Sequence, residues 1–202
     1  MKLLQPACTA QSNAASFGCV QNTIRLRSGA YFDFVNPQPD QFTLRDIAGA
    51  LSKICRFGSQ IERFYSVAEH SYWCSIQANE DLFALDTQAA ALMHDATEAF
   101  IGDVVKPLKI MLPEYGVIEK RMEAVIADKF SIDFARHADV VREIDHAMLI
   151  AERRRLFSAD NVTWSGEDRI RKIHPAFKCW MPDDAEEMFV VRARLVGIGV
   201  NQ

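Results

Sequence analysis

Apolar residues recur every three or four positions along most of the chain, which is the spacing of amphipathic helices. In two of these segments a serine or threonine is followed three residues later by an acidic residue, an arrangement close to a capping box. We expect the last segment to pack back through Met188, Val191 and Leu195. The predicted helices begin at Thr43, Ser66, Ala89, Glu114, Ala138 and Pro182.

One short stretch near the start has the period of a strand instead. Residues 22–27, NTIRLR, alternate polar and apolar side chains, and Ser28-Gly29 is a turn signal. Ala30–Phe34 can then return as a second strand, so we predict a small β-hairpin.

Two segments lack periodicity. Residues 1–20 are rich in Gln, Ala, Ser and Asn, and we expect them to be flexible. Ser158–Met181 is interpreted as a long loop or extension. No linker or internal repeat divides the remainder, so we expect a single domain over residues 21–202.

Residues 89–109, AAALMHDATEAFIGDVVKPLK, place several polar groups in an apolar helix. His94 and Glu98 are one turn apart and share a face, and Asp95 lies about 100° around from His94. Burial of a carboxylate costs several kcal/mol unless it is paired or bound to a metal. A lone His-Asp step is more often a surface pair, so a metal site requires ligands from elsewhere in the chain.

Two other helices supply candidate ligands. His70 lies on the inward stripe of its helix with Val67 and Cys74, where a single histidine is more often a hydrogen-bonded core residue. Asp145 falls inside an apolar stripe and needs a cation there. Two imidazoles and two carboxylates suit a divalent transition metal such as Co, Mn, Zn, Fe or Ni. Such a set leaves positions for water and a substrate oxygen.

Further charged residues lie near these segments. Arg56 follows a helix whose apolar face is complete at Ile54, so it has no evident packing role and would by itself be a solvated side chain. The run Glu152–Arg155 is interpreted as a charged helix face with i,i+4 pairs. Gly102 marks a helix end, and the polar residues after it could be an ordinary connection.

Composition narrows the function classes. The 202 residues carry a net charge of -4 without a run of Lys or Arg, so duplex nucleic acid is not an expected partner. The five cysteines are odd in number and lack CxxC spacing, which indicates a reduced, cytoplasmic protein. No stretch approaches the roughly 20 apolar residues of a membrane span.

The order of these motifs resembles a known family. CRF, then YSVAEHS, then HDATEAFIGDVVKPLK, then DHAMLIAERR are similar to bacterial HD-domain metal-dependent phosphohydrolases, in the group of the 5'-deoxynucleotidases and phage dATP triphosphohydrolases. The resemblance covers roughly Thr23–Gly197. It implies an all-α fold, the HD-domain helical bundle, to which the small N-terminal β-hairpin would be an addition.

The resemblance also implies roles for individual residues. His70, His94, Asp95 and Asp145 match the metal ligands, and Glu98 the carboxylate that handles the attacking water. The matching substrate contacts are Arg56 at the phosphate, Phe57 beside the nucleoside, Asp103 near the sugar, and Lys109, which closes that motif. Asp103 is the second candidate for the catalytic base. Lys106 stands where some relatives carry a neutral residue, which is compatible with a more highly phosphorylated substrate or with a solvated lysine.

The expected activity is therefore hydrolysis of the 5'-O–alpha-phosphorus bond of a dNMP or a dNTP such as dATP. The partner would be a small nucleotide, and we expect a homo-oligomer. Two alternatives stay open. The chain could be an HD phosphohydrolase of a signalling nucleotide or other phosphate ester, or a non-catalytic metal-binding regulatory module. The presence of Glu98, Arg56 and Lys109 beside the four ligands argues against the regulatory module, because a non-catalytic scaffold would need none of the three.

Overall fold

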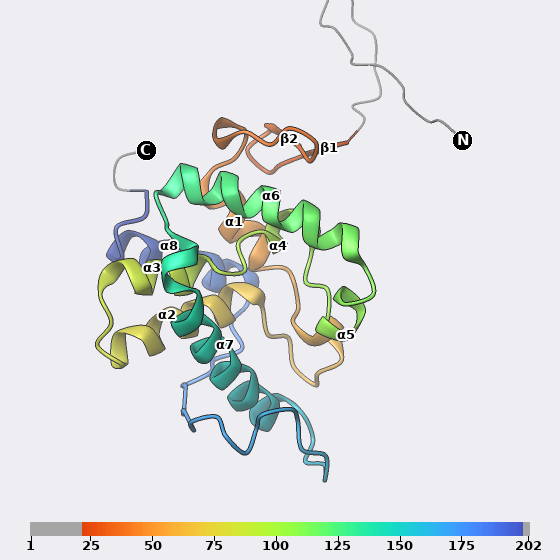
Figure 1. The fold of residues 1–202 in the computed structure, drawn as a ribbon, viewed down its shortest axis with the longest axis vertical. Helices are drawn as coiled ribbons and strands as arrows, with labels where there is room; N and C mark the ends of the chain where they lie inside the picture. The colour runs from red at the N-terminus through yellow and green to blue at the C-terminus, as the bar shows by residue number, and fades with distance from the viewer. Residues whose placement is uncertain (1–21, 200–202) are drawn as a thin grey trace, which may run out of the picture.

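The computed structural model describes residues 22–199, so the expectation for residues 1–20 lies outside the described part of the chain. The described chain is mostly helical, with one small hairpin (Figure 1). The strands are β1 (Thr23–Arg25) and β2 (Tyr31–Asp33). The α-helices are α1 (Leu44–Leu51), α2 (Val67–Glu80), α3 (Leu85–Met93), α4 (Glu98–Ile101), α5 (Lys106–Lys109), α6 (Pro113–Phe130), α7 (Phe134–Leu156) and α8 (Pro182–Leu195). Pro39–Gln41 and Phe57–Ser59 form short 3-10 turns.

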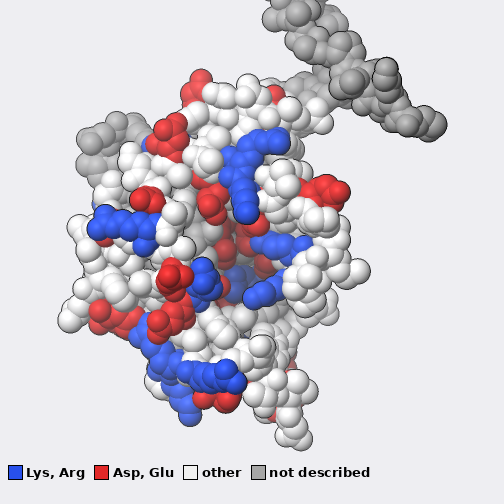
Figure 2. Space-filling view, viewed as in Figure 1, with Lys and Arg blue, Asp and Glu red and all other residues white. Residues whose placement is uncertain are grey.

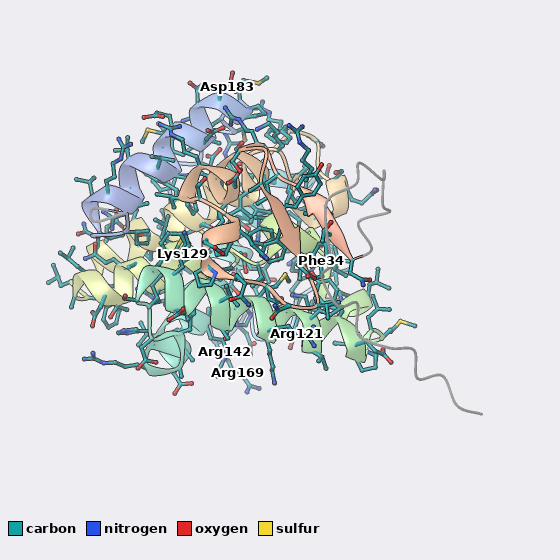
Figure 3. All side chains as sticks on the ribbon, turned by 90° about the horizontal axis from the view of Figure 1, so that it is seen from above. Phe34, Arg121, Lys129, Arg142, Arg169 and Asp183 are labelled. Carbon is teal, nitrogen blue, oxygen red and sulfur yellow. The ribbon has the colours of Figure 1, made fainter. Side chains whose placement is uncertain are left out.

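The predicted hairpin is present. β1 pairs antiparallel with β2, with Ile24 opposite Phe32, and Gly29 takes a φ of 92° in the turn. Figure 3 shows Phe34, at the end of this hairpin, on the same side of the molecule as α6. Arg121 Nη1 of α6 donates to the Phe34 carbonyl at 3.0 Å. The hairpin is therefore held against the bundle by α6 as well as by its own apolar residues.

The core lies where α2 packs against α3, α7 and α8, with α1 against α8 and α4 (Figure 1). Leu51, Leu92, Met148 and Phe189 are fully buried there. α1 begins with the predicted capping box, because Asp46 N–H donates to Thr43 Oγ1 at 3.1 Å while Thr43 N–H donates to Asp46 Oδ2 at 2.9 Å. These elements place the inward stripe of α2 at the centre of the molecule.

The central helix is not continuous, contrary to the prediction. α3 ends at Met93 and α4 begins at Glu98, and residues 94–97 form a tighter turn between them. Within that turn Ala96 N–H donates to the Met93 carbonyl at 3.0 Å, three residues back. The His94 ring bonds the Ala91 carbonyl through Nδ1 at 2.8 Å, which occupies an acceptor of the last α3 turn. His94 therefore lies in this turn and Glu98 at the start of α4, and the two do not share one helix face.

Three other helix predictions were wrong in part. α7 begins at Phe134 instead of Ala138, because Asp133 caps it by accepting the Arg136 N–H at 3.0 Å. α8 buries Ala185, Phe189, Val190 and Ala193, whereas Val191 and Leu195 are exposed. The Glu152–Arg155 run is not a solvated face either, since Glu152 and Arg153 are buried.

Residues 157–181, between α7 and α8, contain no regular helix or strand, as predicted (Figure 1). Glu69 of α2 fastens the end of this segment, because its carboxylate accepts the backbone N–H of Lys178 at 2.6 Å and of Trp180 at 2.7 Å. Arg153 fastens the beginning through Asp160 and Glu167. Among residues 22–199, no helix combines the length and apolarity needed to cross a membrane.

Candidate metal centre

Side chains from three parts of the bundle converge at its centre. His70 Nε2 of α2 lies 3.3 Å from His94 Nε2, at the end of α3, and 3.2 Å from Asp145 Oδ1 of α7. Asp95 Oδ2 lies 3.5 Å from His70 Nε2 and 3.3 Å from His94 Nε2. Donor atoms bound to one metal ion at about 2.0–2.2 Å are separated by distances of this size. The four predicted ligands are thus brought together, although the Asp145 side chain is 40% exposed rather than buried.

Cys74 also belongs to this cluster. His70, Cys74, His94 and Asp145 each offer a donor atom within 4.8 Å of the others, so they form a possible metal-binding group. The Cys74 sulfur lies 3.6 Å from His70 Nε2 and 4.0 Å from Nδ1. Such similar distances place the sulfur beside the imidazole ring, not along the lone pair of Nε2. Asp95, which faces Nε2 of both histidines, is therefore the better placed fourth donor.

Hydrogen bonds on the far side of each ring orient the two histidines. His70 Nδ1 lies 2.6 Å from Glu152 Oε1, and His94 Nδ1 lies 2.8 Å from the Ala91 carbonyl. A proton on each Nδ1 leaves each Nε2 lone pair directed at the centre, as metal-binding histidines require. Glu152 is fully buried. The sequence pattern did not indicate this role, because Glu152 is followed by three arginines that suggest a charged helix face. The one available signal was its position seven residues after Asp145, which places both on the same side of a helix.

Arg56 lies inside the cluster rather than in solvent. Its Nε donates to Glu152 Oε2 at 3.1 Å, and Nη1 lies 3.5 Å from Asp95 Oδ2. Only 10% of the side chain is exposed. Burial opposes ionisation, but Glu152 and Asp95 hold the Arg56 pKa above its usual value. The interpretation that Arg56 has no packing role was wrong, since it neutralises buried carboxylates.

Charge at the centre favours a bound cation. Burial opposes ionisation throughout, yet Asp95 raises the pKa of His94, and His94 lowers the pKa of Asp95 below its usual range. Hydrogen bonds to both histidines likewise lower the pKa of Asp145. Two carboxylates therefore face two imidazole rings at the centre. The carboxylates supply negative charge and neutral imidazoles supply Nε2 lone pairs, so these residues fit a divalent metal ion.

Glu98 lies next to this centre and is 5% exposed. Burial raises its pKa to about 9, and the nearby carboxylates of Asp95 and Asp103 add to the shift. Within residues 22–199, its Oε2 is a buried oxygen without a hydrogen-bond partner. Burial, with Asp95 adding to it, also raises the pKa of Asp103. A carboxyl group in this state can exchange a proton near neutral pH.

The other predicted substrate residues differ in whether their side chains already contact other protein groups. Phe57 has a positive φ of 58° and packs edge-on against Phe157, with ring centroids 5.1 Å apart. The ammonium of Lys109 lies 2.7 Å from Glu119 Oε1, so this lysine is already paired with α6. Lys106 is exposed in α5 and makes no ion pair within the described residues. Glu119 would therefore compete with a substrate phosphate for Lys109, which the sequence pattern did not indicate.

A cavity of about 210 Å³ opens beside the centre, between α6 and α7. Its lining is mainly apolar and includes His94, Glu123, Phe134, Ala135, Ala138 and Val141. In Figure 2 the face that carries α6 and α7 is hollowed near its middle, with acidic and basic side chains around the hollow. The cavity is thus bordered by a candidate metal ligand, His94, and by one carboxyl group, Glu123, while its α7 side suits an apolar group.

Two known proteins are similar to this sequence. The first, described as the uncharacterized protein YfdR of Escherichia coli, is 39% identical over 141 residues, which span 70% of this chain and 76% of that protein. The second, the uncharacterized protein RCAP_rcc00048 of Rhodobacter capsulatus, is 31% identical over 139 residues, or 64% of this chain and 68% of its own length. No protein-family model matches the sequence.

Proposed function

The chain belongs to the same family as YfdR, and we propose that it is a metal-dependent phosphohydrolase of deoxyribonucleotides. The names of its relatives carry no activity, so the proposal comes from the site and from the HD-type motif order. One observation carries it most directly. A buried carboxyl oxygen of Glu98, which has no hydrogen-bond partner in the described part of the chain, lies next to a cluster that suits one metal ion.

His70, His94, Asp95 and Asp145 would hold a divalent transition metal such as Co, Mn, Zn, Fe or Ni. When bound, such an ion lowers the pKa of a water and polarises a phosphoryl oxygen. The protein's part is to fix the four donors. Helix α2, the turn that follows α3, and helix α7 would do this from separate directions, so the site would depend on the packing of these helices.

Glu98 handles the proton of the attacking water. The water oxygen forms a bond to the alpha phosphorus, the bond from phosphorus to the nucleoside 5'-oxygen breaks, and the 5'-oxygen gains a proton. In its ionised form Glu98 would accept a proton from the water and then deliver a proton to the leaving 5'-oxygen. Burial raises the pKa of Glu98 to about 9, which favours the protonated form that makes this second transfer. The products are a deoxynucleoside and phosphate from a dNMP, or triphosphate from a dNTP.

Positive groups at the edge of the centre suit the phosphate oxygens. Arg56 would be available through its Nη1 edge, whose only polar contact among residues 22–199 is the long one of 3.5 Å with Asp95. Two lysines of α5 are further candidates: Lys106 is exposed, and Lys109 is paired with Glu119. The apolar cavity beside His94 can take the nucleoside, with Phe57 and Asp103 as further contacts.

The experiment is a substrate panel on purified protein. We expect release of deoxynucleoside from one or more dNMPs or dNTPs with Mn²⁺ or Co²⁺, and no release by the His94→Ala variant. Identification of phosphate, pyrophosphate and triphosphate separates the two substrate types. Turnover only of a signalling nucleotide or another phosphate ester would instead support the first alternative.

Metal binding without turnover of any phosphate ester would support a regulatory module. The same panel therefore decides among the three readings of the centre. Measurement of metal content on each preparation is needed, because an apoprotein would give a false negative.

A further inference from the structure

We propose that Glu152 is a positioning residue that sets, through one carboxylate, both the His70 tautomer and the place of Arg56. This inference rests on the proposed function, because it assumes that His70 binds a metal. Glu152 itself does not face the cluster. It lies behind His70, on α7, with its two oxygens directed at different partners.

The two oxygens have separate tasks. Oε1 lies 2.6 Å from His70 Nδ1, which keeps a proton on that nitrogen and leaves Nε2 free for a metal. Oε2 lies 3.1 Å from both Nε and Nη2 of Arg56. The carboxylate therefore accepts from both neighbours and donates to neither.

Complete burial makes this arrangement specific. Glu152 and His70 have no exposed side-chain surface, and Arg56 has 10%. Water is thus poorly placed to substitute for either contact, and within the described chain no other carboxylate contacts His70 Nδ1. Arg56 also reaches Asp95, so one chain of contacts joins two candidate ligands through Glu152 and Arg56.

A carboxamide cannot meet both demands, which makes Glu152→Gln the informative variant. If its oxygen faces His70, its NH₂ group faces the Arg56 donors. If its oxygen faces Arg56, its NH₂ group faces Nδ1 and favours the tautomer with a proton on Nε2, where the metal should bind. Either orientation disturbs a contact that the native carboxylate satisfies.

The experiment measures Co²⁺ affinity of the full chain by calorimetry. We expect Glu152→Gln to bind Co²⁺ about 10–100-fold more weakly than wild type. The matched control is Glu186→Gln, which alters another buried carboxylate, paired with Arg45 at 3.3 Å on α1. This control should keep wild-type affinity even if its melting temperature falls.

A second measurement needs no variant. In Zn²⁺-loaded wild type labelled with ¹⁵N-histidine, NMR should show a proton on His70 Nδ1 and none on Nε2. Wild-type affinity in Glu152→Gln would overturn the inference while the proposed function stands. A proton on His70 Nε2 in the Zn²⁺-loaded protein would overturn the inference and also remove His70 from the proposed ligands. Failure of the wild-type protein to bind any metal would overturn both. Tight metal binding with a Glu152-dependent affinity but no hydrolysis would support the inference and reject the proposed activity.

Discussion

Arg56 and Glu152 form an ion pair inside the bundle, with Nε 3.1 Å from Oε2 and the carboxylate fully buried. The two residues come from segments 96 positions apart. Because neither group can move into water without rearrangement of the centre, the pair links stability to the site. Removal of either residue is therefore expected to lower the stability of the fold, and not only to remove a contact for the substrate.

We predict that Arg56→Ala lowers the free energy of unfolding by about 3–5 kcal/mol, because it leaves a buried carboxylate without its cation. Urea unfolding of the metal-free protein measures this. Arg154→Ala is the control, since Arg154 pairs with Glu167 at the surface and should cost no more than about 1 kcal/mol. Equal, small losses in both variants would show that the Arg56 pair does not stabilise the fold.

The identity of the fourth metal donor is tested by two substitutions. His94→Ala should lose the ion, whereas Cys74→Ala should keep one ion per chain, because the Cys74 sulfur lies beside the His70 ring. Elemental analysis measures both. The Co²⁺-loaded wild type should also lack a sulfur-to-cobalt charge-transfer band. A strong band that disappears in Cys74→Ala would make Cys74 a ligand and demote Asp95.

Glu98 should separate catalysis from metal binding. Glu98→Ala is expected to keep the metal and bind nucleotide but turn over at least about a hundredfold more slowly, the usual contribution of a general acid or base. Glu98→Gln tests the charge alone, since it keeps the shape. Metal content, nucleotide affinity and turnover are measured on one preparation. Metal loss in Glu98→Ala would make Glu98 a ligand, and full activity would move the base to Asp103.

The cavity beside His94 should hold the nucleoside. Ala138 lines it and is only partly buried, so Ala138→Phe fills space that a substrate would occupy. We expect KM to rise about tenfold or more, as for a steric change in an apolar pocket, while kcat and metal content change little. Steady-state kinetics on the preferred nucleotide decide this. An unchanged KM would place the nucleoside elsewhere, with the Phe57 side of the centre the next candidate.

Acid pH should reduce the stabilisation that the capping box at the N-terminus of α1 provides. Burial opposes ionisation of Asp46, but hydrogen bonds from Ser28 and Thr43 outweigh it and lower the pKa of Asp46 below 3.8. A lowered folded-state pKa stabilises the fold above the unfolded pKa, about 3.9, and this stabilisation disappears as pH falls through the folded value.

Asp46→Asn should therefore unfold more easily than wild type at pH 7, by about 1 kcal/mol or more, as expected for a lost cap interaction. The difference should narrow as the pH falls below about 4. Denaturant melts at several pH values measure it, with Asp139→Asn, a change at a 95% exposed side chain, as the control. A constant difference across the range would show that Asp46 ionisation does not contribute.

Short-range patterns were sufficient for several elements. The Thr43 and Asp46 spacing predicted a capping box, and Ser28-Gly29 predicted the turn between β1 and β2. The inward position of His70 followed from the apolar stripe of its helix. Each of these depends on residues a few positions apart, whose geometry is determined by the backbone of a single element.

Other local predictions were wrong because a side chain competed with the backbone. His94 bonds the Ala91 carbonyl, and the helix breaks there although the sequence is rich in helix-forming alanine. Asp133 caps α7 earlier than the apolar pattern indicated. Helical spacing reports a preferred face, but it does not show which polar group will take a particular backbone acceptor or donor.

By itself, the sequence determined that His70, His94 and Asp145, which it predicted as metal ligands, lie on separate segments of the chain, but it did not indicate that Cys74 would join their cluster. Only the tertiary structure decided that Glu152 and Arg56 face each other and that Lys109 pairs with Glu119. The physical reason is that periodicity describes the surface of one helix. Which charges meet across two helices depends on how those helices pack, and burial then makes the Glu152–Arg56 pairing costly to break.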